Sequence, residues 1–313
     1  MGRDELFEGA KVVIVAGKGG VGKTTTAAVL ARAASATGRR VLAVDIEGKR
    51  GLATAFGASS LHYDEQELVA AGDGDGGVLG RTLPPDDALV EYLGDHGLRR
   101  LSHRLTRTGM LDLVATATPG IKDILILGKI RQLAERPDID LVVVDAPAAG
   151  HAIGFLRAPA TLLNMARMGP IHSQSQRALQ LLQDGDRTRV VLVTVAEETP
   201  VTELIETAFA LEDDIGLHLG PVVVNGCEPP PDSGTGSTAA ELASETGLRL
   251  AEGTLAGLDA AGRYRRVRRA VQDAQIERLA EQLPLRRIEL DWVYRADSGR
   301  DLVERLSDQV LAT

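Results

Sequence analysis

The chain has 313 residues, of which 44% are hydrophobic and only 3% aromatic, and its formal net charge at pH 7 is −9. Such a composition predicts a core of aliphatic side chains, as in buried parallel strands, and the length suits one large α/β domain or two small ones. The acidic balance argues against a general affinity for nucleic acid, so we expect no nucleic-acid partner. The single cysteine, Cys227, excludes an intrachain disulfide framework and a zinc site with several thiolates from this chain.

Targeting signals are not apparent in the sequence. It does not open with a secretory leader, and no run of about 18 apolar residues occurs in it. We therefore expect a soluble, cytoplasmic protein.

Predicted strands and helices alternate along the chain. The expected strands cover residues 11–16, 39–45, 78–83, 140–145, 189–195, 220–225 and 286–290. The expected helices cover residues 25–33, 86–94, 121–135, 263–283 and 299–311, and residues 98–114 mix helical spacing with basic side chains. Turn-forming clusters fall at residues 72–77 and 229–234. This alternation predicts an α/β fold with a doubly wound, mostly parallel sheet and helices on both faces.

The pattern shows no internal repeat and no clean domain boundary. We therefore predict one domain over residues 1–313, with a loose N-terminal segment at residues 1–9. Residues 155–185 are a candidate helical flap. Its apolar residues are Leu162, Leu163, Met165, Met168, Leu179, Leu181 and Leu182. Apolar stripes at helical spacing belong mostly to cores and interfaces, and we favour that interpretation over a binding flap.

A glycine-rich loop that matches the pattern G-x-x-x-x-G-K-[ST] follows the first predicted strand and precedes a predicted helix. This order lets backbone N–H groups surround phosphate oxygens at a helix N-terminus. Lys23 is expected to bind the β- and γ-phosphates, and the Thr24 hydroxyl is expected to bind Mg²⁺. The residues expected to hold the nucleotide are Gly17, Gly19, Gly20, Val21, Gly22, Lys23, Thr24 and Thr25. The predicted cofactors are ATP and magnesium.

Carboxylates follow two further predicted strands, at the edge of the sheet where ligands of parallel α/β proteins bind. An apolar run ends at Asp145, the Walker B pattern, and Asp145 is expected to hold Mg²⁺ through a water molecule. Asp45 and Glu47 follow the second strand, where a carboxylate can orient the attacking water or sense the γ-phosphate. For Glu47 the alternative is an ordinary solvated loop position.

The loop resembles that of the deviant Walker A ATPases. This class includes the arsenite-pump ATPases, the tail-anchored-protein targeting ATPases, the septum-site and plasmid-partition ATPases and nitrogenase iron protein. In the string G-K-G-G-x-G-K-[ST], Lys18 is similar to their signature lysine. The resemblance implies that Lys18 crosses a dimer interface to the partner's nucleotide, where a cation stabilises the charge that develops in phosphoryl transfer.

Two later segments resemble the arsenite-pump and targeting ATPases in particular. Residues 145–151 are similar to their D-T-A-P-T-G-H switch, with the Asp, Gly and His kept and the threonines lost. The resemblance implies that Gly150 is a hinge and that His151 contacts the partner or reports the nucleotide state; a structural histidine is the alternative. Asn225 ends a V-V-N strand, which implies that its carboxamide reads the adenine edge.

A shorter bacterial branch of anion-transporting ATPases is a closer match. Its E-G-[KR]-x-G loop and P-G-[IVL]-[KR]-D-[IV]-L helix resemble Glu47–Gly51 and Pro119–Leu125. Members of this branch often occur as paired paralogues, so the resemblance implies a homodimer or a heterodimer with a paralogue. It also implies an ATP-driven switch that acts on a protein client or a membrane-protein partner.

The sequence differs from the family motifs at several positions, and these differences argue against some of the family's functions. Arsenite-pump ATPases bind the metalloid through three thiolates, and one cysteine cannot do so; the C-x-x-C clasp of the targeting ATPases is also missing. Glu47 is longer than the aspartate of many relatives, which predicts slow or partner-stimulated hydrolysis. The alternatives are a partition or positioning ATPase and a small-molecule kinase. Residues 300–308 have balanced charge and predict a packed helix rather than a membrane-binding one.

Overall fold

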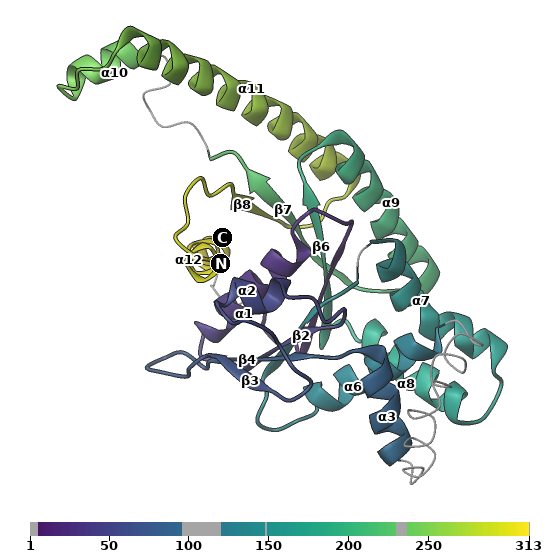
Figure 1. Cartoon of the computed structure of the whole chain (residues 1–313). Coiled ribbons are helices and arrows are strands. Elements are labelled where there is room, and N and C mark those ends of the chain that lie inside the picture. Colours follow the sequence, from purple (N-terminus) through teal and green to yellow (C-terminus); the bar gives the residue numbers. More distant parts are fainter. Residues whose placement is uncertain (1–5, 96–119, 148, 230–236, 313) are drawn as a thin grey trace.

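The computed structural model describes residues 6–95, 120–147, 149–229 and 237–312 of the chain. Within them eight strands form one sheet in the order β3-β4-β2-β5-β1-β6-β7-β8 (Figure 1). The strands are β1 (Val12–Gly17), β2 (Val41–Asp45), β3 (Gln66–Val69), β4 (Val78–Thr82), β5 (Leu141–Asp145), β6 (Thr188–Val195), β7 (Leu219–Cys227) and β8 (Arg287–Asp291). Neighbouring strands are parallel, apart from β3, which pairs with β4 in the antiparallel sense.

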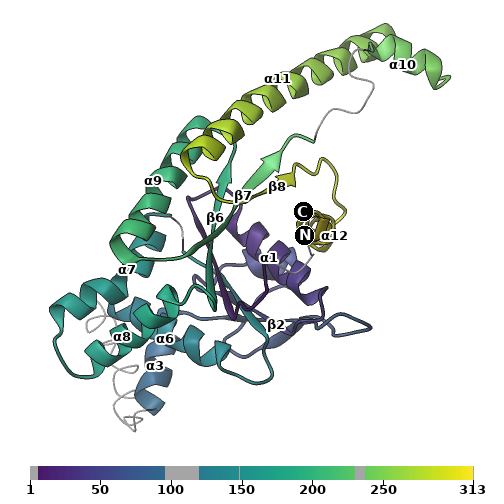
Figure 2. The same cartoon turned by 180° about the vertical axis from the view of Figure 1, so that it is seen from behind.

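Helices cover both faces of this sheet, as Figures 1 and 2 show from opposite sides. One layer contains α1 (Lys23–Ser35), α2 (Gly51–Ala55) and α12 (Gly299–Ala312). The other contains α6 (Ile121–Ala134), α7 (Ala149–Met165), α8 (Pro170–Gln183) and α9 (Glu198–Ile215), with α3 (Pro85–Asp95) against α6. The doubly wound, mostly parallel α/β fold predicted from the sequence is confirmed.

The aliphatic strands divide their side chains between the two helical layers. Val12 and Ile14 of β1 belong to the cluster with α6, α7, α8 and α9, whereas Val13 and Val15 belong to the cluster with α1 and α12. All four side chains are fully buried. Since strand side chains alternate in direction, a strand between two helical layers must be apolar at every position, which is why the predicted strands read as continuous apolar runs.

The last helix, α12, packs against α1. The balanced charge of its sequence predicted a packed helix. Val303, Leu306 and Val310 of α12 are buried in the same cluster as α1. In the described ranges no helix is both long and apolar enough to cross a membrane.

A long helix, α11 (Glu252–Gln282), is attached to the sheet from Arg265 onward. The Gln272 side chain accepts the Glu228 N–H at 2.7 Å and donates to the Gly226 carbonyl at 3.1 Å. The Glu228 carboxylate is buried, and Arg265 and Arg268 pair with it from α11. The first half of α11 extends away from the sheet together with α10 (Ala239–Glu245), as both views show (Figures 1 and 2).

Helices α2 and α10 were not predicted, and α11 and β3 also differ from the sequence prediction. Helix α11 begins at Glu252, eleven residues before the predicted start at residue 263. Three glycines at positions 253, 257 and 262 lower the local helix propensity, but Asp259 accepts the N–H of Ala239 and so joins this segment to α10. The antiparallel edge strand β3 was missed, because four residues are too few for a periodic pattern. The predictions for residues 98–114 and for most of 229–234 lie outside the described residues.

The described part of the predicted loose segment at residues 1–9 contains two packed side chains. Leu6 and Phe7 are buried, and the guanidinium of Arg39 lies over the Phe7 ring at 5.9 Å from its centroid. Leu6 and Phe7 belong to the hydrophobic cluster that contains α1 and β1. Two apolar residues before the first strand form no periodic pattern, so the sequence could not predict their burial.

The candidate flap consists of α7 and α8. Leu162, Leu181 and Leu182 are buried, in agreement with the favoured interpretation as core, whereas Met165 at the end of α7 and Met168 between α7 and α8 are exposed.

Replacing Phe7 with alanine is expected to lower the free energy of unfolding by about 3 kcal/mol, because a fully buried ring leaves a cavity. Denaturant titration measures this effect, and Glu8→Ala, at an exposed neighbouring side chain, is the control. Equal stabilities of the two variants would show that Phe7 is not part of the core.

Candidate functional site

The glycine-rich loop connects the end of β1 to the start of α1 and lies against two other strands. A Cβ on Gly17 would lie 2.4 Å from the carbonyl oxygen of Val193 in β6. Gly22 has a left-handed φ of 93°, and a Cβ there would lie 2.1 Å from the amide nitrogen of Asn225 in β7. Larger residues at these two positions would push the loop off the sheet, so the glycines fix its place at the carboxyl edge.

Lys23, the first residue of α1, points back into the loop. Its side chain is nearly buried and its ammonium donates to the Lys18 carbonyl at 3.1 Å. Burial lowers the pKa of Lys23, although Asp145 and Glu47 oppose this effect. A cation enclosed by the loop at a helix N-terminus suits the binding of phosphate oxygens.

Thr24 at the start of α1 contacts Asp145 at the end of β5. The Thr24 hydroxyl donates to Asp145 Oδ2 at 2.6 Å, while Asp145 Oδ1 is buried without a hydrogen-bond partner in the described part of the chain. Burial raises the pKa of Asp145 to about 6; the Thr24 hydrogen bond opposes this rise and the charge of Asp45 adds to it. The sequence placed these two residues together as magnesium ligands, and the structure brings them into contact.

Asp45 lies beside Asp145, because β2 and β5 are neighbours and the two aspartates are register partners. Asp45 Oδ1 accepts the N–H groups of Glu47 and Gly48 at 2.9 and 3.0 Å and so shapes the following turn. Its Oδ2 is buried without a partner among the described residues, and burial raises its pKa.

Glu47 lies on the outer side of this turn. Its carboxylate accepts a hydrogen bond from Lys49 at 2.8 Å, and its side chain is about one third exposed (32%). This position is close to the aspartate pair but open to solvent.

Lys18 has a different partner and a more exposed side chain than Lys23. Its side chain is 46% exposed and its ammonium pairs with Glu203 of α9. The two lysines of the loop therefore divide into one that faces the loop interior and one at the protein surface.

The remaining predicted residues lie nearby. The Asn225 amide donates to the Val21 carbonyl at 3.0 Å, so its donor group supports the loop. Gly150 and His151 occupy the first turn of α7, after the strand that ends in Asp145; their side-chain surroundings and residue 148 lie outside what the structure describes. Thr25 follows Thr24 in the first turn of α1.

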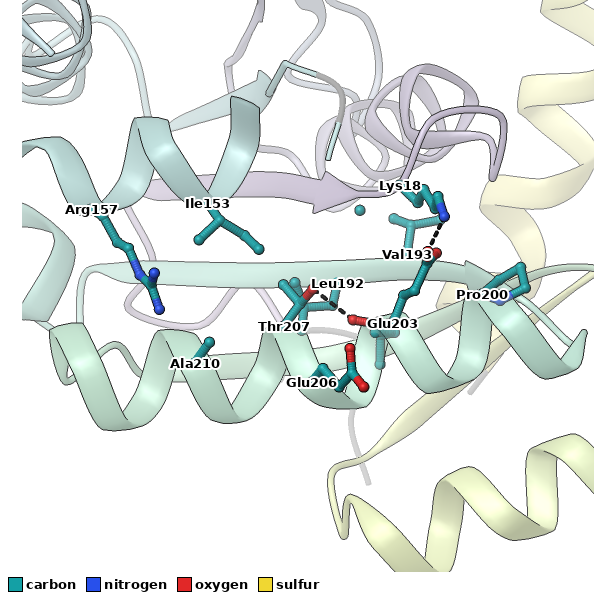
Figure 3. A pocket seen from close by; sticks show the side chains of 12 residues that line it. Lys18, Ile153, Arg157, Leu192, Val193, Pro200, Glu203, Glu206, Thr207 and Ala210 are labelled. Atoms are coloured by element: carbon teal, nitrogen blue, oxygen red, sulfur yellow. Dashed lines mark hydrogen bonds and ion pairs between the residues drawn. The ribbon is translucent and has the colours of Figure 1, made fainter. Parts of the chain in front are cut away.

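A cavity of about 490 Å³ adjoins the loop between α7, α9 and β6 (Figure 3). Lys18 and Glu203 meet at one end of it, and Arg157 of α7 lies toward the other end (Figure 3). Its other lining residues are Gly17, Ile153, Leu192, Val193, Pro200, Leu204, Glu206, Thr207 and Ala210.

Sequence reasoning missed Glu203. A single glutamate on an amphipathic helix belongs to no motif, and only the pairing of β1 with β6 brings α9 to the loop. Lys49 was noticed as part of a family motif, but not as the partner of Glu47.

Comparison with known proteins finds a family model and several relatives that match this chain. The family model described as anion-transporting ATPase matches residues 10–174, just over half of the chain. "ATPase BagA" of Mycobacterium tuberculosis is 35% identical over 232 residues, which cover 72% of this chain and 67% of the relative. "Putative ATPase Mb3704" of Mycobacterium bovis matches to the same extent. "ATPase get3" of Schizosaccharomyces japonicus is 28% identical over 173 residues, 52% of this chain and 51% of the relative.

Replacing Asp145 with asparagine is expected to stabilise the protein in the absence of metal and nucleotide. The folded-state pKa of about 6 lies above the ordinary value of 3.8, so the ionised carboxylate destabilises the folded state. This penalty is complete above about pH 6 and disappears below about pH 4, where both states are protonated.

Chemical denaturation in EDTA measures the difference. The variant should be more stable by about 3 kcal/mol at pH 8 and nearly equal to the wild type near pH 3. Asp64→Asn, at an exposed position, should change neither value. An Asp145→Asn variant that is less stable than the wild type at pH 8 would contradict the expectation.

Proposed function

The chain belongs to the anion-transporting ATPase family and is an ATPase, and we propose that it works as a dimeric switch driven by ATP hydrolysis. Two copies, or one copy and a close paralogue, bind Mg-ATP between them and change shape when the terminal phosphate leaves. The observation that carries the proposal is the different burial of the two loop lysines: Lys23 is buried in the loop, whereas Lys18 is at the surface. A surface lysine that follows the first glycine of the loop is available to a nucleotide in a second subunit.

The loop fits the phosphates of ATP. A Cβ on Gly19 or Gly20 would meet no heavy atom within 4 Å, so this face of the loop is open for phosphate oxygens. Backbone N–H groups and the Lys23 ammonium supply the hydrogen bonds and the positive charge there. Asn225 holds the loop through Val21, and in our proposal its remaining carboxamide oxygen takes part in adenine recognition.

The residues at the carboxyl edge also fit magnesium. Asp145 and Asp45 each have a buried carboxylate oxygen without a partner in the described ranges, and Mg²⁺ prefers oxygen ligands. No cluster of three or more His, Cys, Asp or Glu occurs in those ranges. That is compatible with Mg²⁺ in phosphoryl-transfer sites, which one or two protein oxygens share with the phosphates. We assign Thr24 and, through a water molecule, Asp145 to the metal, which supplies neutralisation of phosphate charge.

Asp45 and Glu47 have different parts in this proposal. Asp45 fixes the turn that carries Glu47, since its Oδ1 accepts two backbone N–H groups of that turn. Glu47 orients the attacking water, and for this it must leave Lys49. This requirement supports a hydrolysis that is slow until a partner rearranges the turn.

The switch begins at the same edge of the sheet. Gly150 and His151 follow Asp145 by five and six residues and open α7, so a change at the phosphate can move α7 directly. We propose that α7 and α8 transmit this movement to a protein client or a membrane-protein partner, with Met165 and Met168 exposed at their junction. An arsenite substrate is not part of the proposal, because the one cysteine, Cys227, is buried and arsenite requires several thiolates.

The central experiment measures phosphate release and nucleotide-dependent association together. With Mg-ATP, sedimentation of the Glu47→Gln variant, alone and mixed with its paralogue, should show a dimer that dissociates with ADP. The wild type should release inorganic phosphate. Transfer of the phosphoryl group to a small-molecule acceptor would identify a kinase instead, and a monomer under all these conditions would refute the switch.

Replacing Lys23 with alanine is expected to weaken ATP binding about 100-fold, because the phosphates lose a charged hydrogen bond. Calorimetric titration with a non-hydrolysable ATP analogue measures the affinity. Lys11→Ala, a lysine before the opposite end of β1, is the control and should bind normally. A normal affinity of Lys23→Ala for the ATP analogue would show that Lys23 does not bind the phosphates.

Replacing Lys18 with alanine is expected to leave the affinity of the subunit for ATP nearly unchanged but to lower turnover about 100-fold, as loss of a charge-stabilising group does. Steady-state phosphate release at saturating ATP measures it. Undiminished turnover would show that Lys18 does not act on the partner's nucleotide.

A further inference from the structure

The ion pair between Lys18 and Glu203 joins the phosphate loop to a helix that no motif connects with it. Gly17 of β1 pairs with Val193 of β6, so the first residue of the loop lies at the end of β6. Helix α9 begins only a few residues after β6, and Glu203 is in its second turn. This connection brings the carboxylate to the cavity end where Lys18 lies (Figure 3).

The pair has a poorly satisfied carboxylate. Glu203 Oε1 pairs with Lys18, whereas Oε2 is shielded from solvent and has no hydrogen-bond partner in the described part of the chain. An unpartnered buried oxygen is costly, so this pair leaves part of the desolvation cost of the carboxylate uncompensated. Both side chains are also more than one third exposed, and ion pairs of this kind contribute little to stability.

These features distinguish the pair from a structural bridge. It holds the lysine in one place but costs little to break. A triphosphate offers the same ammonium several charged oxygens, and such charge-assisted hydrogen bonds are stronger than an exposed pair with one carboxylate oxygen. Lys18 is therefore placed to exchange one anionic partner for another.

We propose that Glu203 is a positioning residue that holds Lys18 on its own subunit and releases it when Lys18 crosses to the nucleotide of the partner subunit. This inference rests on the proposed role of Lys18 in trans. Glu203 then lowers the tendency of the ATP-bound subunits to associate, since each active dimer must break two such pairs. The residue keeps the lysine from its catalytic position until a partner with bound ATP is present.

The test is the dependence of turnover on protein concentration. Glu203→Gln should lower the protein concentration at half-maximal turnover by about threefold per released pair, and so by about tenfold for a dimer. Turnover at saturating protein and the KM for ATP should stay near the wild-type values. A structural role would instead lower the melting temperature and leave the concentration dependence unchanged.

Two control variants are available on the same helix. Glu206→Gln changes an exposed carboxylate that lines the same cavity and forms no ion pair among the described residues, and it should behave as the wild type. Glu203→Asp keeps the charge and should restore most of the wild-type concentration dependence.

The double variant Lys18→Ala/Glu203→Gln separates this inference from the proposed function. If Glu203 acts by holding Lys18, its replacement has no further effect once the lysine is removed, so the double variant should equal Lys18→Ala. A folded Glu203→Gln variant with unchanged or weaker association overturns the positioning role while leaving the role of Lys18 intact. Undiminished turnover of Lys18→Ala overturns both.

Discussion

The carboxyl edge of the sheet is organised around two aspartates that are buried side by side. Asp45 and Asp145 end adjacent parallel strands, and each keeps one buried oxygen without a partner in the described ranges. Lys23 lies close by as a buried cation, and Thr24 donates to Asp145. Burial of these two carboxylates destabilises the free protein, and a site with this property gains free energy when a cation binds. In our proposal, the protein thus gives up stability at the site of ATP hydrolysis.

The sequence was sufficient to predict the parts of the molecule that local rules determine. The loop before Lys23, the strand that ends in Asp145 and the alternation of strands and helices all follow from residue type and spacing, and the structure contains them. The contact of Thr24 with Asp145 could be expected because both belong to known motifs at one sheet edge. Glu203 could not be found in this way, because its role depends on the order of strands in the sheet. The sequence did not identify Phe7 as a core residue for a similar reason, because its burial depends on the packing around it.

The two loop lysines illustrate how one short segment can serve two tasks. Lys23 gains its position from α1, whose first residue it is, and so it follows the helix N-terminus. Lys18 has no regular element of its own, and the backbone around it is set by glycines. Its direction is therefore decided by whichever anion it meets. A buried cation and a surface cation thus lie within six residues of one loop, and our proposal uses the first for phosphate binding and the second for contact with a second subunit.

Helix α11 adds a mechanical property to this arrangement. It is fixed to the end of β7 through Gln272 and Arg265, and the same strand end holds the phosphate loop through Asn225. The thirteen residues from Glu252 to Tyr264 extend roughly 20 Å beyond that attachment. A tilt of about 10° at the attachment displaces the free end by roughly 3 Å over this length. A small rotation at the attachment would thus be enlarged along α11, and Gly226 at this attachment is the chain neighbour of Asn225, which contacts the loop.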